Sequence, residues 1–238
     1  LVLTVVMMYK HFEVNAKEDA EREAHSTIYA PMCSRVSFDL PDGTTGMLNS
    51  GSKLSYSLPF TTKRQVELEG EAWFEVTHNE QLPFEIVAGS STINVLGTSF
   101  NVSAYPKGDY IEVVLLNGKV EFKDNKINEG VIIYPSERLV LQNGKISKSI
   151  VDVLKYNAWT EGWLVFKGDT MSEVARRIER WYDVEIIFSD KELESYTFRG
   201  TFHNDKLEDV LRYLAMTSPI RYKISPGVMM PDGTYKKE

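Results

Sequence analysis

The sequence of 238 residues is poor in cysteine and histidine, and it has no excess of positive charge. Its single cysteine, Cys33, excludes a disulfide framework within the chain, and we expect this residue to be a small buried side chain. The net charge of −7 argues against nucleic-acid binding, which requires a basic surface. The composition therefore indicates a globular protein with no nucleic-acid partner.

Motifs that would indicate catalysis or a cofactor are also missing. There is no GxSxG sequence, no P-loop and no GxGxxG sequence. The four histidines show neither the HxH nor the HExxH spacing that is typical of metal sites. The run Gly97-Thr98-Ser99 is too short to cradle a phosphate and lies between predicted strands. The sequence predicts no catalytic residue, no metal site and no cofactor, and hence a protein that is not an enzyme.

The N-terminal segment, residues 1–26, opens with nine almost wholly apolar residues. Nine residues cannot cross a bilayer, because a spanning helix needs about 20. Two interpretations remain open. These residues are the outer end of a transmembrane helix followed by a juxtamembrane linker, or they form a core strand rich in valine and threonine.

Residues 27–147 read as an all-β domain of the sandwich or jelly-roll type, because turn sequences recur at short spacing between β-rich runs. The pair Asn117-Gly118 predicts a type I′ hairpin between the strands that flank it. Residues 66–76 predict a long strand whose alternate side chains are apolar. Gly70 stands in the apolar set of that strand, which indicates a bulge or a close backbone approach.

The pattern changes after a connector, residues 148–162. Residues 163–226 predict a strand, a helix and a strand, followed by the same series again at an offset of 36 positions. A repeated β-α-β unit of this size predicts a small two-layer domain. We expect Asp169 and Asp205 to be the N-caps of the two helices. The fold class predicted from the whole sequence is α+β with two domains.

The last strand of each predicted unit lies at residues 184–188 and residues 220–224. The tail, residues 227–238, contains Pro231-Asp232-Gly233 and is expected to form a hairpin or an extended tail.

Three groups of residues are candidates for function. Glu67, Glu69 and Glu71 share one face of a predicted strand, which is either a solvated sheet face or a site for a cation or a glycosidase carboxylate pair. Trp73 on the same face is either packed under a loop or part of a contact surface. A predicted helix presents a basic cluster that is either a solvated face or a docking site for an acidic partner. A predicted edge strand with two outward cations is a candidate for strand addition by a partner. The candidate partner-binding residues are Trp73, Arg176, Arg177, Arg180, Ile220, Arg221, Tyr222, Lys223 and Ile224.

The order and spacing of several runs resemble those of the FecR family of cell-envelope sigma-factor regulators, in the form found in Bacteroides-type bacteria. The C-terminal repeat is similar to the domain that follows in these proteins, which itself resembles the N-terminal signalling domain of secretins and TonB-dependent transporters. The runs that carry the resemblance are LPDGTTGMLNSGSKLSY at 40–56, VELEGEAWFEV at 66–76, LPFEIVAG at 82–89, VLGTSFNVSAY at 95–105 and LLNGKVEF at 115–122.

The resemblance implies the periplasmic sensor region of a single-pass inner-membrane anti-sigma factor. Such a protein relays the substrate-loaded state of a TonB-dependent outer-membrane transporter to an extracytoplasmic-function sigma factor. The implied partners are the signalling domain of the transporter, the inner membrane through an N-terminal helix, and the sigma factor through a cytoplasmic segment outside this chain. The alternative is a β-sandwich glycan-binding module or carbohydrate-active enzyme that uses Trp73, Glu67, Glu69 and Glu71.

Overall fold

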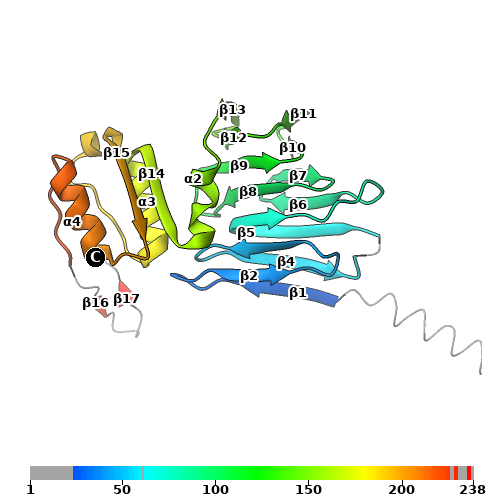
Figure 1. Ribbon diagram of the computed structural model, residues 1–238, viewed down its shortest axis with the longest axis horizontal. Coiled ribbons are helices and arrows are strands. Elements are labelled where there is room, and N and C mark those ends of the chain that lie inside the picture. The colour runs from blue at the N-terminus through cyan, green and yellow to red at the C-terminus, as the bar shows by residue number, and fades with distance from the viewer. Residues whose placement is uncertain (1–23, 61, 226–227, 230–234, 237–238) are drawn as a thin grey trace, which may run out of the picture.

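The computed structural model describes residues 24–60, 62–225, 228–229 and 235–236. A large β-rich part is followed by a smaller part made of strands and helices (Figure 1). The predicted α+β fold class with two parts is confirmed. The apolar residues 1–9, with their two interpretations, lie outside the described residues.

The β-rich part, residues 24–150, is called the β-module below. Its strands are β1 (Ala24–Tyr29), β2 (Val36–Asp39), β3 (Thr45–Leu48), β4 (Lys53–Leu58), β5 (Arg64–Glu75), β6 (Phe84–Ala88), β7 (Ser91–Val95), β8 (Ser99–Ala104), β9 (Tyr110–Asn117), β10 (Val120–Asp124), β11 (Ile127–Ile133), β12 (Glu137–Gln142) and β13 (Lys145–Ile150).

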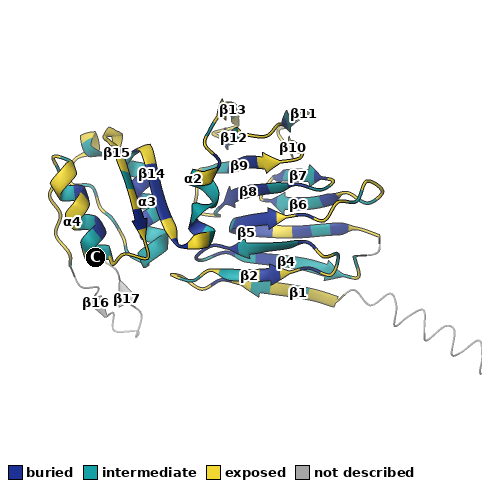
Figure 2. Cartoon of the chain, viewed as in Figure 1, coloured by how far each residue is buried: buried dark blue, intermediate teal, exposed yellow. Residues whose placement is uncertain are grey.

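These strands form one 13-stranded sheet that curls into two layers around a single core. One layer has the order β1-β4-β5-β6-β7-β10-β11 and the other has the order β2-β3-β5-β8-β9-β12-β13. All pairs are antiparallel except β5 with β6. Phe74 and Phe84 come from different layers, and their ring centroids lie 6.2 Å apart. Buried side chains alternate along the strands because every second residue faces this core (Figure 2).

Strand β5 belongs to both layers, and Gly70 is where it passes from one to the other. Glu69 pairs with Lys53 of β4, whereas Gly70 already pairs with Ala104 of β8. Gly70 has φ +115°, and a Cβ at this position would overlap the side chain of Ser52. The predicted close backbone approach is therefore confirmed, and only glycine fits it.

The hairpin predicted at Asn117-Gly118 is wrong. Strand β9 pairs with β8 and β12, whereas β10 pairs with β7 and β11, so this turn carries the chain from one layer to the other. A type I′ turn needs positive φ at both central residues, and here only Gly118 has it. The type I′ geometry occurs instead at Asn143-Gly144, where φ is +50° and +71° and where β12 pairs directly with β13.

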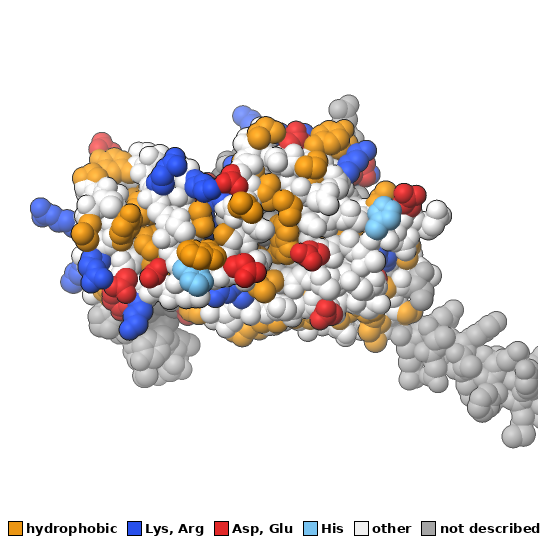
Figure 3. Space-filling view, viewed as in Figure 1, with side chains coloured by type: hydrophobic (Ala, Val, Ile, Leu, Met, Phe, Trp, Pro, Cys, Tyr) orange, Lys and Arg blue, Asp and Glu red, His pale blue; other side chains and the backbone are white. Residues whose placement is uncertain are grey.

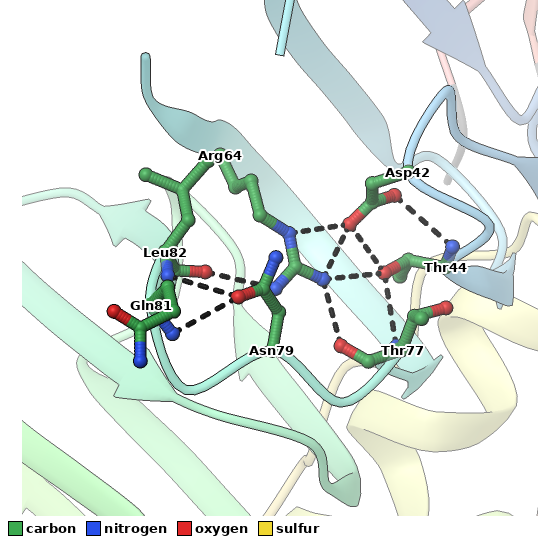
Figure 4. Close-up of polar contacts among 7 residues, drawn as sticks. All are labelled: Asp42, Thr44, Arg64, Thr77, Asn79, Gln81 and Leu82. Atoms are coloured by element: carbon green, nitrogen blue, oxygen red, sulfur yellow. Dashed lines mark hydrogen bonds and ion pairs between the residues drawn. The ribbon is translucent and has the colours of Figure 1, made fainter. Parts of the chain in front are cut away.

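Arg64 is the largest polar side chain in the core, with 2% of its surface exposed. Its guanidinium binds the Asp42 carboxylate at 2.6 Å and donates to the carbonyl oxygens of Leu82, at 3.0 Å, and Thr77, at 2.8 Å (Figure 4). The second nitrogen contact to Asp42, from Nε, measures 2.8 Å. This network joins the β2–β3 turn to the chain that follows β5, and no local sequence pattern indicates it.

Cys33 is exposed and lies in a turn between β1 and β2 with φ +59°. The prediction that it is buried is wrong, because its position is set by the turn and not by its apolar character. Its backbone N–H donates to Ser50 Oγ at 2.8 Å.

Ser136 occupies a left-handed conformation, with φ +67°, in the exposed turn before β12. We expect Ser136→Gly to raise the free energy of unfolding by about 1 kcal/mol, because glycine removes the steric cost of positive φ. Urea denaturation measures the change. Ser147→Gly, in strand β13, is the control and is expected to lower stability by roughly 0.5–1 kcal/mol. A Ser136→Gly protein that is less stable than the parent would contradict the argument.

The C-terminal module, residues 163–225, follows a helical connector. Its strands β14 and β15 pair with each other in antiparallel register, and helices α3 and α4 complete its apolar core. The elements after β13 are α2 (Leu154–Asn157), the 3-10 helix η1 (Ala158–Glu161), β14 (Trp163–Thr170), α3 (Met171–Tyr182), the 3-10 helix η2 (Lys191–Ser195), β15 (Thr197–His203), α4 (Leu207–Thr217), β16 (Val228–Met229) and β17 (Tyr235–Lys236). The pairing of β16 with β17 agrees with the predicted C-terminal hairpin.

The structure has the first strand and the helix of each predicted repeat unit, and matching apolar positions of the two helices are buried. Val174 and Val210, which are 36 residues apart, are both buried, as are Ile178 and Leu214. The third element of each unit differs from the prediction, because residues 184–188 and residues 220–224 are described but form no strand. The β-α-β units are therefore β-α units that share one two-stranded sheet.

The two helix caps predicted from the sequence are wrong. Thr170 caps α3 and forms a capping box with Glu173, while Asp169 ends strand β14 and accepts hydrogen bonds from Lys155 and from the backbone N–H of Lys167. Asp205 accepts from the N–H of His203, and the N-cap residue of α4 makes no side-chain hydrogen bond. Each aspartate closes the end of its strand instead of the start of its helix.

Candidate functional site

The candidate site is the contact between the β-module and the C-terminal module, which lie side by side in Figure 1. Polar side chains from both modules and from the connector line a cavity there. Hydrogen bonds, an ion pair and cation–π contacts join the two parts. They are made by helix α3, by the loop between β8 and β9, by the β1–β2 loop and by the connector itself.

The arginines of α3 do not form a solvated face. Arg180 lies over the ring of Tyr105 at 4.6 Å, and Arg176 lies over the ring of Tyr110 at 5.3 Å. Arg176 also pairs with Asp109 at 3.5 Å. These distances are those of cation–π contacts, so this side of α3 is covered by the β-module.

Arg177 lines the cavity between the modules, but its hydrogen bond and ring contact are to its own module. Its guanidinium donates to the carbonyl oxygen of Val165 at 2.6 Å and lies 4.9 Å from the ring of Phe166. This hydrogen bond joins α3 to β14 within the C-terminal module. The three arginines that the sequence grouped as one cluster have separate structural roles.

The connector is anchored by Trp159, which is 2% exposed. Its Nε1 donates to Asn101 Oδ1 at 3.1 Å, and its carbonyl oxygen accepts from Arg35 at 3.1 Å. The Nδ2 of the same Asn101 donates to Glu71 at 2.9 Å. The indole is thereby tied to the surface of the β-module by a continuous set of hydrogen bonds.

Arg35, in the β1–β2 loop, forms a second clamp on the C-terminal module. Its guanidinium lies 4.6 Å from the ring of Trp181 at the end of α3, and it donates to Asn204 Oδ1 at 3.4 Å. The apolar character of Trp159 is consistent with its docking on a module. No local pattern in the sequence indicates the contacts of Arg35.

A small polar cavity of about 60 Å³ lies inside the contact. The buried Glu112 pairs with Arg138 at its wall, and Lys155 of the connector pairs with the buried Asp169 of β14. Burial raises the pKa of Glu112, because the Arg138 guanidinium only partly offsets the loss of solvent. Cations and carboxylates alternate around the cavity, so it has no strong preference for an ion of either sign.

Burial also changes the titration of the groups that face α3. The pKa of Tyr110 lies above its ordinary value because of burial and of the nearby Glu112. Burial opposes the charge of Arg180, but Tyr105, Glu71 and Tyr110 outweigh this effect and raise its pKa. Arg180 is therefore a permanent cation against neutral tyrosines.

The glutamate row and the tryptophan do not form a binding surface. Glu71 is turned into the network of Asn49 and Asn101, whereas Glu67 and Glu69 are exposed. Trp73 is 7% exposed, so it is packed and not presented to a partner as the contact-surface interpretation required. The described residues hold no cluster of His, Cys, Asp and Glu that suits a metal ion.

The predicted edge strand at residues 220–224 is an exposed segment without sheet pairing. Ile220 is partly buried against the module core, but Tyr222 and Ile224 are 44% and 51% exposed. The predicted inward alternation is wrong, because no neighbouring strand orients the segment. Arg221 and Lys223 are exposed, as expected.

None of the helices in the described ranges is long and apolar enough to cross a bilayer.

The fold and the contact define a protein of two parts, a β-module and a smaller α+β module, each with its own apolar core. Residues 26–121 match the family described as FecR protein, and residues 163–228 match the family described as FecR, C-terminal. The chain belongs to the FecR family. It is a regulatory protein of the anti-sigma factor class.

Two solved structures are similar to the chain. A candidate anti-sigma factor from Parabacteroides distasonis ATCC 8503 is 33% identical, with a TM-score of 0.78, and the match covers 84% of this chain and 95% of that one. A second crystal structure of a candidate anti-sigma factor from this organism is 30% identical, with a TM-score of 0.74, covering 90% and 100%. No curated protein matches the chain.

Proposed function

We propose that this chain is the periplasmic sensor region of a single-pass inner-membrane anti-sigma factor. In this role it relays the substrate-loaded state of a TonB-dependent outer-membrane transporter to an extracytoplasmic-function sigma factor. The C-terminal module receives the N-terminal signalling domain of the transporter. The sigma factor is bound by a cytoplasmic segment of the protein, which an N-terminal helix links through the inner membrane.

The observation that carries the proposal is the exposed segment at residues 220–224. Apolar Tyr222 and Ile224 alternate there with Arg221 and Lys223, and no other described segment covers them. Basic and hydrophobic side chains also lie side by side over this module in Figure 3. Such a mixture suits a partner surface that offers carboxylates around apolar side chains.

We expect the double substitution Arg221→Glu with Lys223→Glu to weaken binding of the transporter signalling domain at least tenfold. The charge reversal replaces attraction by repulsion, while stability stays nearly constant because both side chains are exposed. Isothermal titration calorimetry of the chain with the signalling domain measures the affinity, and induction of the regulon in cells is expected to fall.

The matched control is Lys123→Glu with Lys145→Glu, which reverses two exposed lysines on the β-module. It carries the same change in net charge and is expected to leave binding within a factor of about two, since long-range charge effects are screened at physiological salt. If the segment variant binds as tightly as the control, residues 220–224 are not the partner site.

A further inference from the structure

We infer that the two modules are held together by a reversible polar latch, in which Arg176 and Arg180 of α3 contact the β8–β9 loop and the start of β9, and Arg35 contacts Trp181 at the C-terminal end of α3. The latch has a docked and a released state. As a regulatory element it rests on the proposed function, because release of the latch is then the change that partner binding produces in the sensor.

The first argument is that the modules share no apolar core. The buried cluster of the β-module contains no residue of α3, and the buried cluster of the C-terminal module contains no residue of the β-module. Each part therefore buries its own hydrophobic side chains without the other. Contacts between modules that lack a common hydrophobic core commonly permit relative motion.

The second argument concerns the kind of contact. Arginine lies on an aromatic ring twice at the C-terminal end of α3, with Arg180 over Tyr105 and Arg35 over Trp181. The pair of Arg176 with Asp109 keeps 37% and 55% of the two side chains exposed. Contacts of this kind are individually weak, and salt screens the exposed charges.

The third argument is that docking leaves a polar atom unsatisfied. Nε of Arg176 is buried and has no hydrogen-bond partner among the described residues. A buried donor without a partner opposes the docked state, because water would bind it after release. The docked state is therefore stabilised by several weak contacts and opposed by the unpaired Nε of Arg176.

The connector keeps the released module tethered. Trp159 is bound to Asn101 and Arg35 of the β-module, and Lys155 is bound to Asp169 of β14. The Trp159–Asn101 and Lys155–Asp169 contacts involve none of the latch arginines, whereas Arg35 takes part in both the tether and the latch. Opening of the latch is thus a limited rotation about the connector, and not a separation of the two parts.

The test uses the full chain with spin labels at Lys145→Cys and Met216→Cys in a Cys33→Ser background, because both labelled positions are exposed. Pulsed electron–electron double resonance gives the distribution of distances between the two spin labels, one on each module. The latch variant is Arg176→Ala with Arg180→Ala. The matched control, Arg199→Ala with Arg212→Ala, removes two exposed arginines of the same module.

We expect one narrow distance for the parent chain and for the control at low salt. The latch variant is expected to show a broad, longer distribution, and 1 M NaCl is expected to broaden the parent in the same direction. Thermal melts establish that each module of the variant is still folded. Arg176→Lys with Arg180→Lys retains charge without the planar stacking and is expected to lie between the two. If the folded Arg176→Ala with Arg180→Ala variant keeps the narrow distance distribution of the parent, the proposed latch is wrong.

Adding the transporter signalling domain separates the latch from the proposed function. A shift of the parent toward the long distances supports release on partner binding. Binding without a shift overturns the regulatory role of the latch and leaves the proposed partner intact. If the signalling domain does not bind while the latch variant shows the longer distances, the proposed partner is wrong and the latch is supported.

Discussion

Arg64→Met is expected to lower the free energy of unfolding by about 3–5 kcal/mol, because it leaves the carboxylate of Asp42 buried without its cation. The carbonyl oxygens of Leu82 and Thr77 lose their donors in the same change. Methionine fills most of the volume of the arginine stem, so the loss reports the polar network and not a cavity. Equilibrium unfolding in guanidinium chloride measures it.

Two controls sharpen this measurement. Lys63→Ala removes the neighbouring exposed lysine, whose pair with Glu85 at 3.3 Å is expected to contribute below about 1 kcal/mol. Asp42→Asn combined with Arg64→Met is expected to cost less than the sum of the single changes, because the two side chains form one network. Strict additivity of the two substitutions would contradict the geometry in Figure 4.

Trp159→Ala is expected to lower the free energy of unfolding by about 3–5 kcal/mol, since this buried indole is the main apolar anchor of the connector. Trp159→Phe keeps a ring in the site but leaves Asn101 Oδ1 without its donor, and about 1 kcal/mol of stability is expected to be lost. Calorimetric scans of both variants measure the difference. Equal losses for the two substitutions would mean that packing of the ring contributes nothing.

Local physics explains what the sequence predicted correctly. Gly70 was identified as a close approach because a glycine among alternating apolar residues has few other reasons to be there. The helical periodicity of residues 171–181 predicted the inner face of α3, since that face packs on its own module. The resemblance added the family, which periodicity alone does not contain.

The errors have a common cause, which is that contacts between distant segments decide the outcome. Asn117-Gly118 and Asn143-Gly144 are equivalent as dipeptides, but only the second joins strands that pair with each other. The outer face of α3 reads as solvated because the sequence does not place Tyr105 and Tyr110 against it. The buried Arg64 likewise depends on a turn that lies 22 residues earlier in the chain.

The passage of β5 through both layers has a mechanical consequence for a protein that transmits a signal. Strand β5 is hydrogen-bonded to β4 and β6 in one layer and to β3 and β8 in the other. The two layers cannot slide past each other or separate unless the hydrogen bonds of this strand break. The β-module therefore moves as one stiff body. Strand β1 runs along one edge of that body and begins on the side that faces away from the C-terminal module (Figure 1). A displacement imposed on the β-module where the C-terminal module contacts it therefore reaches the start of β1 as a rigid movement of the whole β-module.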